Sequence, residues 1–198
     1  MLKIGITGNI GSGKTTVSKI FEILGVPVFY ADDTAKSVMV KDPVLIDALK
    51  KEFGSESYFD DGSLNRKHIA SIVFNNEAEL EKLNAIVHPA VFRAFDNWVT
   101  AIKNVPYVVK EAALLFESSS YQMCDKTIMV AAPFELRINR VVQRDNLTRA
   151  EVESRNARQF SEEKKVGLAD FVIRNDDTEL VIPQVLELHR KFLTLSSH

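Results

Sequence analysis

Eight residues near the N-terminus have the types and spacing of a phosphate-binding loop. They match the pattern G-x-x-x-x-G-K-[ST] in the run Gly8-Asn9-Ile10-Gly11-Ser12-Gly13-Lys14-Thr15. In such a P-loop, backbone N–H groups surround a phosphate, the lysine reaches the outer phosphates and the last hydroxyl holds Mg²⁺. The sequence therefore predicts a nucleotide site with Thr15 as the metal ligand and the lining Gly11, Ser12, Gly13, Lys14, Thr15 and Thr16.

The elements on either side of this loop are the ones that a P-loop needs. Apolar residues at every second position, Leu2, Ile4 and Ile6, predict a strand before it. After it, apolar residues at helical spacing predict a helix over 16–24, and Gly25 follows where a helix end favours positive φ. A strand, a glycine-rich loop and a helix together place a helix N-terminus at the phosphate.

Composition excludes several classes of protein. The chain has 198 residues and a net charge of −2, so no global charge favours nucleic acid or an acidic membrane. Cys124 is the only cysteine, so intramolecular disulfides and CxxC metal sites are excluded. No apolar run approaches the roughly 18 residues of a membrane span. We expect a cytoplasmic monomer or weak homo-oligomer that binds neither nucleic acid nor membrane.

Four further apolar segments predict strands at 26–30, 107–109, 127–130 and 171–173, with helical patterns between them. This alternation favours an α/β fold with a parallel sheet and helices on both faces. The segment between the second and third strands is far longer than the crossover of about a dozen residues that parallel strands need. We therefore predict an inserted, mostly helical subdomain over 32–103, including a helix that starts after Pro89.

A second unusual region lies at 137–158, which contains six of the ten arginines and no lysine. Arg140 and Arg144 are one helical turn apart, and Arg is the residue for bidentate phosphate contacts. Thr148 and Glu151 have the spacing of a capping box, so two helices should meet between 144 and 148. We interpret 137–158 as a lid that brings positive charge to a phosphoryl group. The alternative is an ordinary surface with acidic partners.

Other candidates stand where strands end. Asp32 follows the second strand, where a carboxylate can deprotonate an attacking hydroxyl or lie near Mg²⁺; it could equally be a helix N-cap, and Asp33 is adjacent. Glu111 ends the third strand and could assist a metal-bound water. Residues Leu114, Leu115, Phe116 and Glu117 could wall a pocket, or could be core plus a capping carboxylate. His88, before Pro89, is the one histidine whose position suggests a role.

Together these motifs resemble the dephospho-coenzyme A kinase family along nearly the whole chain. The resemblance rests on the P-loop TGNIGSGKTT, the A-D-x-x-A pattern at 31–35, His88-Pro89, the LLFE run at 114–117, RVVQRD at 140–145, Gln159 and ADFVIRN at 169–175. The chain departs from the family pattern at Ala113, usually Pro, and at Asn9, usually Gly.

The resemblance implies a P-loop kinase with a five-stranded parallel sheet that uses ATP and Mg²⁺ to phosphorylate the ribose 3′-hydroxyl of dephospho-coenzyme A. It implies a nucleotide-binding core at 1–31, 104–136 and 159–198, a substrate-binding insertion at 32–103 and a lid at 137–158. Implied catalytic residues are Asp32, Lys14, Arg140 and Arg144. Arg140 and Asn175 would bind ATP, Asn175 near the adenine. Substrate contacts would come from Thr7, Asp32, His88 and the residues 114–117.

Three other functions compete with this interpretation. A kinase for another small acceptor, such as a nucleoside monophosphate, would use the same P-loop, insertion and lid. A nucleotide-dependent switch would bind partners, but the Asn-Lys-x-Asp element of guanine-specific switches does not occur. Balanced charge and short length argue against a nucleic-acid-dependent ATPase.

Overall fold

The structure is a computed structural model that describes residues 1–74 and 76–196, and it divides into two compact units. The first unit contains Met1–Tyr30 and the chain from Ile102 onward, and the second contains Ala31–Ala101. No helix within the described ranges is long and apolar enough to cross a membrane.

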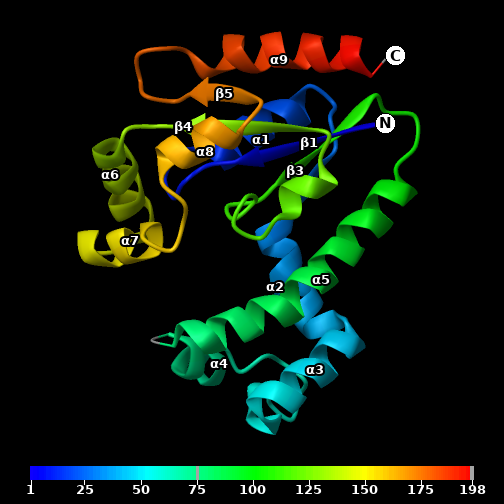
Figure 1. The fold of residues 1–198 in the computed structure, drawn as a ribbon, viewed down its shortest axis with the longest axis vertical. Helices are drawn as coiled ribbons and strands as arrows, with labels where there is room; N and C mark the ends of the chain where they lie inside the picture. Colours follow the sequence, from blue (N-terminus) through cyan, green and yellow to red (C-terminus); the bar gives the residue numbers. More distant parts are fainter. Residues whose placement is uncertain (75, 197–198) are drawn as a thin grey trace. The chain divides into compact units, whose positions relative to one another are not determined.

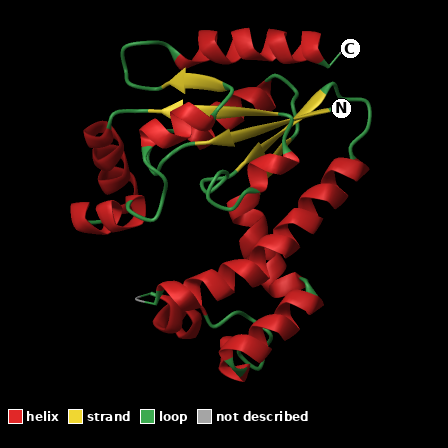
Figure 2. Cartoon of the chain, in the orientation of Figure 1, coloured by secondary structure: helices red, strands yellow, loops and turns green. Residues whose placement is uncertain are grey.

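The first unit is built on a five-stranded sheet in the order β2-β3-β1-β4-β5 (Figures 1 and 2). Every pairing is parallel, so the carboxyl ends of all five strands lie at one edge. The sheet confirms the predicted fold class, with strand ends shifted by up to two residues. The strands are β1 Leu2–Thr7, β2 Val28–Tyr30, β3 Tyr107–Glu111, β4 Lys126–Ala131 and β5 Phe171–Arg174.

Helices cover both faces of this sheet (Figure 1). They are α1 Lys14–Ile23, α8 Glu162–Leu168 and α9 Val181–Leu195, whereas α6 Phe134–Asp145 and α7 Arg149–Asn156 pack on each other beyond the strand ends (Figure 1). Residues Ile4 and Ile6 of β1 pack with Phe21 of α1 and Phe192 of α9 in one buried core. On the opposite face, Gly5 leaves room for Leu115, because a Cβ there would lie 2.8 Å from a Leu115 methyl carbon.

Gly25 ends α1 as the sequence predicts. Its φ is +82°, and its N–H donates to the Glu22 carbonyl at 2.9 Å. The Val26 N–H donates to the Phe21 carbonyl at 3.0 Å, which completes a Schellman motif. Val26 is thereby held in the helix end, which explains why β2 begins at Val28 and not at Val26.

The second unit, Ala31–Ala101, is mostly helical. Its helices are α2 Ala31–Lys41, α3 Pro43–Phe53, α4 Arg66–Val73 and α5 Glu77–Ala101. The expectation that a helix starts after Pro89 is wrong, because α5 continues through that proline. Pro89 removes one backbone hydrogen bond from the helix. The buried residues Val87, Ala90, Val91 and Phe95 lie on both sides of it, and this continuous packing keeps the two halves in one helix.

Candidate active site

The P-loop connects β1 to α1 at the carboxyl edge of the sheet. The Ser12 N–H closes a turn on the Asn9 carbonyl at 3.0 Å, and α1 begins at Lys14. Gly11 and Gly13 have φ of +79° and +91°, a left-handed conformation that costs other residues energy. The loop therefore directs backbone N–H groups and the N-terminus of α1 toward one point, as an anion site requires.

These two glycines also admit close neighbours. A Cβ on Gly13 would collide with the side-chain amide of Asn175, and a Cβ on Gly11 would collide with the Arg137 carbonyl oxygen. Both positions thus exclude a side chain for two reasons, the backbone conformation and the lack of space.

Contacts from distant segments fix the P-loop. Asn175, directly after β5, donates its amide to the Ser12 carbonyl at 2.8 Å. The Ile10 N–H donates to the Gln159 side chain at 2.8 Å, and the Asn9 amide donates to the Phe160 carbonyl at 2.9 Å. Asn9, which departs from the family pattern, is thus part of a contact between the P-loop and the segment before α8. The resemblance implies a place near the adenine for Asn175, and in the structure its amide supports the P-loop.

A pocket of about 400 Å³ opens beside the P-loop. This volume is within the usual range for small-molecule sites. Its lining combines residues of the P-loop and the start of α1 with two arginines and an asparagine that are remote in sequence. The lining residues are Ile10, Gly11, Gly13, Lys14, Thr15, Thr16, Arg140, Arg144 and Asn175. The structure thereby brings together every residue predicted to bind ATP except the buried Ser12.

Glu111 lies beneath the P-loop. One oxygen of this buried carboxylate is 3.7 Å from the Lys14 ammonium, and the other accepts a hydrogen bond from the Thr15 hydroxyl at 3.2 Å. A hydroxyl beside a carboxylate offers the oxygen ligands that Mg²⁺ prefers, and Mg²⁺ uses one or two carboxylates plus phosphates and water. The donor set therefore fits the implied metal. Within the described residues no cluster of three or more His, Cys, Asp or Glu could hold a metal by itself.

The predicted arginine cluster divides into separate roles. Arg137 is only 3% exposed, and its guanidinium donates to the Ala132 and Ile10 carbonyls and to Asn156. Burial lowers the pKa of Arg137, and the nearby Glu162 opposes this. Arg137 is therefore a structural residue that joins α6 to α7 and to the P-loop. The capping box of Thr148 and Glu151 is confirmed where α7 begins.

Arg140 and Arg144 are the two arginines that line the pocket. Arg140 donates to the Asn175 carbonyl at 3.0 Å and to Asp177 at 2.8 Å, which places its guanidinium at the end of β5. Arg144 is exposed and forms a bidentate pair with the adjacent Asp145. Arg149 pairs with Glu135 and Glu153 and is absent from the lining.

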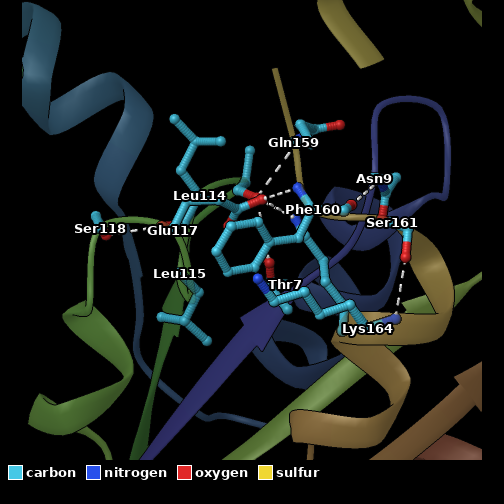
Figure 3. A network of polar contacts seen from close by, with 12 residues as sticks. Thr7, Asn9, Leu114, Leu115, Glu117, Ser118, Gln159, Phe160, Ser161 and Lys164 are labelled. Carbon is cyan, nitrogen blue, oxygen red and sulfur yellow. Dashed lines mark hydrogen bonds and ion pairs between the residues drawn. The ribbon is translucent and has the colours of Figure 1, made fainter. Parts of the chain in front are cut away.

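The turn after β3, residues 113–117, has buried side chains and hydrogen bonds to distant segments. Leu115 and Phe116 are buried, and the Glu117 carboxylate accepts the Phe160 N–H at 2.8 Å (Figure 3). Thr7 is fully buried, and its hydroxyl donates to the Ala113 carbonyl at 3.3 Å. The pocket lining contains none of these residues, so their assignment to substrate binding stays a prediction.

Lys165, which no sequence pattern indicates, pairs with Glu117 at 2.9 Å from a fully buried position on α8. Burial lowers the pKa of Lys165, and the Glu117 carboxylate opposes this shift. Lys165 follows Glu162-Glu163-Lys164, a run that reads as the solvated face of a helix. No local pattern distinguishes it from its exposed neighbour Lys164.

Asp32 and His88 belong to the second unit. The N-cap alternative for Asp32 is wrong, because α2 begins at Ala31 and Asp32 lies in its first turn. Asp32 is exposed and has no ion-pair or hydrogen-bond partner among the described residues, whereas Asp33 pairs with Lys36 at 2.7 Å. His88 stacks on Phe92 in α5. Catalysis by Asp32 and substrate binding by His88 stay predictions.

Comparisons with known proteins agree on one family. A family model described as dephospho-CoA kinase matches residues 2–180. The dephospho-CoA kinase of Bacteroides fragilis is 40% identical over 187 residues, covering 94% of this chain and 91% of that protein. The crystal structure of TT1252 from Thermus thermophilus has a TM-score of 0.84 and 34% identity, covering 96% of both chains. Dephospho-CoA kinase from Campylobacter jejuni shares the fold, with a TM-score of 0.71, 24% identity and 97% coverage of both.

From the pocket lining we predict different effects on kcat when each of two exposed arginines is replaced by lysine. Arg144→Lys keeps the charge but loses the planar fork that contacts a phosphoryl group bidentately, so we expect kcat to fall about 10²-fold. Arg149→Lys makes the same change away from the pocket lining and should leave kcat near the wild-type value. Steady-state turnover of both purified variants checks this. Equal activity of Arg144→Lys and Arg149→Lys would show that Arg144 is ordinary surface.

Proposed function

This chain belongs to the dephospho-CoA kinase family, and we propose that it transfers the γ-phosphoryl group of ATP to the ribose 3′-hydroxyl of dephospho-coenzyme A. The observation that carries the proposal is the pocket in which the P-loop, Arg140, Arg144 and Asn175 converge. The family match covers residues 2–180 and disfavours the alternative, a nucleoside monophosphate kinase.

The P-loop and Lys14 bind the phosphates of ATP in this proposal. Backbone N–H groups at the start of α1 provide hydrogen bonds, and the Lys14 ammonium contacts the β- and γ-phosphates. Lys14 lies 3.7 Å from Glu111, which orients the ammonium before ATP binds. Thr15 and Glu111 would hold Mg²⁺, which when bound neutralises charge on the β- and γ-phosphates.

Arg140 and Arg144 stabilise the charge that develops on the transferring group. Phosphoryl transfer depends on positioning and electrostatic stabilisation more than on covalent chemistry. Arg140 is oriented by the Asn175 carbonyl and Asp177, whereas Arg144 is exposed and pairs with the adjacent Asp145. We propose that phosphate oxygens replace Asp145 as the partner of Arg144 when 137–158 acts as a lid.

The second unit, residues 31–101, contributes the acceptor side. Asp32 follows the last residue of β2 by two positions and is therefore covalently tethered to the carboxyl edge of the sheet, where ligands of open α/β sheets bind. A carboxylate there can accept the proton of the ribose hydroxyl and orient the hydroxyl oxygen toward the γ-phosphorus. His88, Thr7 and residues 114–117 stay candidates for binding the rest of the acceptor.

The proposed acceptor is tested by measuring ADP release with ATP, Mg²⁺ and a panel of acceptors. The panel is dephospho-coenzyme A, AMP, CMP, shikimate and adenosine. We expect activity with dephospho-coenzyme A alone, and a product phosphorylated at the ribose 3′ position. Strong activity with AMP and none with dephospho-coenzyme A would refute the proposal and support the nucleoside monophosphate alternative.

The role of Asp32 is tested by replacing each of two adjacent aspartates, Asp32 and Asp33, with asparagine. Asp32→Asn should lower kcat about 10²-fold, because Asn cannot accept a proton at neutral pH and loose phosphoryl transfer needs the base only moderately. ATP affinity should be nearly unchanged, since the P-loop supplies the phosphate contacts. Asp33→Asn is the matched control, because Asp33 is paired with Lys36. Wild-type turnover of Asp32→Asn would end the catalytic assignment.

A further inference from the structure

Lys165 is a charged side chain with 0% exposure that the proposed mechanism does not use. Removing an ammonium group from water is costly unless it is paired and hydrogen-bonded. Both conditions are met, because the Lys165 Nζ lies 2.9 Å from the Glu117 Oε1 and donates to the Ala113 carbonyl at 2.9 Å. Both partners belong to the turn 113–117 that follows β3.

The Ala113 carbonyl oxygen joins three further segments of the chain. Besides Lys165 it accepts the Thr7 hydroxyl at 3.3 Å and the Gln159 amide at 3.5 Å. Thr7 is the last residue of β1 and directly precedes the P-loop. Lys165 is the charged donor among the three, and charge-assisted hydrogen bonds are roughly twice as strong as neutral ones.

Glu117 extends the same network to the P-loop by a second route. Its Oε1 accepts the Phe160 N–H at 2.8 Å, and the Phe160 carbonyl accepts the Asn9 amide at 2.9 Å. The neighbouring Gln159 accepts the Ile10 N–H at 2.8 Å. Figure 3 shows Thr7, Asn9, Glu117, Gln159 and Phe160 gathered in this network. The segment 159–160 therefore contacts both the P-loop and the turn 113–117.

We propose that Lys165 is a positioning residue that fixes the turn 113–117 against the P-loop. It is fully buried and absent from the pocket lining, so it acts through Ala113 and Glu117 and not on the reacting atoms. The kinetic part of this inference rests on the proposed function, in which the turn 113–117 contributes to the acceptor side. Displacing a positioning element by about 1 Å can cost 10²-fold in rate.

The simpler explanation is that Lys165 only neutralises Glu117. The two explanations differ for a protein in which both charges are removed. A neutral pair of similar volume often restores the stability of a buried ion pair. It does not restore the hydrogen bond from Lys165 to the Ala113 carbonyl. A variant with normal stability and impaired positioning is therefore expected only from the positioning role.

The experiment compares four variants of the full chain. Lys165→Met leaves Glu117 buried and unpaired, and should lower both the melting temperature and kcat. Glu117→Gln alone measures any direct loss of a Glu117 contact to the acceptor. In Lys165→Met/Glu117→Gln the melting temperature should recover, while kcat stays at least about 10-fold below that of Glu117→Gln and the ATP Kd stays within about twofold of wild type. Lys19→Met is the control, because it makes the same change at an exposed lysine of α1, and it should behave as wild type.

Hydrogen exchange of residues 112–118 gives a readout that does not depend on the acceptor. We expect faster exchange there in the double variant than in wild type at equal global stability. Wild-type kcat and wild-type exchange in the double variant would overturn the inference and leave Lys165 as a neutralising residue. Inactivity of the wild-type protein on dephospho-coenzyme A would instead refute the proposed function, and exchange of 112–118 would still decide the role of Lys165.

Discussion

The site depends on the hydrogen bond from the Asn175 amide to the Ser12 carbonyl, 2.8 Å long, across the P-loop. Glycine residues lose more conformational entropy than other residues when the backbone is ordered. This cost opposes the formation of an ordered anion site in a glycine-rich loop. Contact from the end of β5 removes part of it before any nucleotide binds. The absence of a side chain at Gly13 is what lets the amide approach. The strand order therefore matters for chemistry, because β4 places β5 where its last residues reach the loop that follows β1.

The charged groups of the first unit form two layers with different tasks. Buried charges, Arg137 and Lys165, bond to backbone carbonyls and to carboxylates, and they join the P-loop to α6, α7, α8 and the turn 113–117. Partly exposed charges, Lys14, Arg140 and Arg144, line the pocket. Buried ion pairs contribute little net stability but tolerate few other arrangements. The inner layer thus holds the outer one in place. Although the chain has a net charge of −2, the charged residues in the pocket lining are all cationic.

Local signals explain what the sequence predicted well. The P-loop pattern, the strand alternation, the end of α1 at Gly25 and the capping box at Thr148 each depend on residues within a few positions. The roles of Asn175 and Lys165 depend on contacts across 163 and 52 residues, which no local pattern encodes. Arg137 looks like a lid arginine by spacing, and only the fold shows that it is buried. Pro89 misled for the same reason, since tertiary packing of α5 overrides the local preference of proline for a helix start.

We infer that the shape of the P-loop, imposed by its neighbours, creates the nucleotide site. The most direct test is the ATP affinity of Gly13→Ala measured by titration calorimetry. A methyl group at this position opposes the φ of +91° and collides with Asn175. We predict at least about a 10²-fold weaker Kd, equivalent to roughly 2.7 kcal/mol, with the folded structure retained by circular dichroism. Wild-type affinity in a folded Gly13→Ala protein would contradict this account.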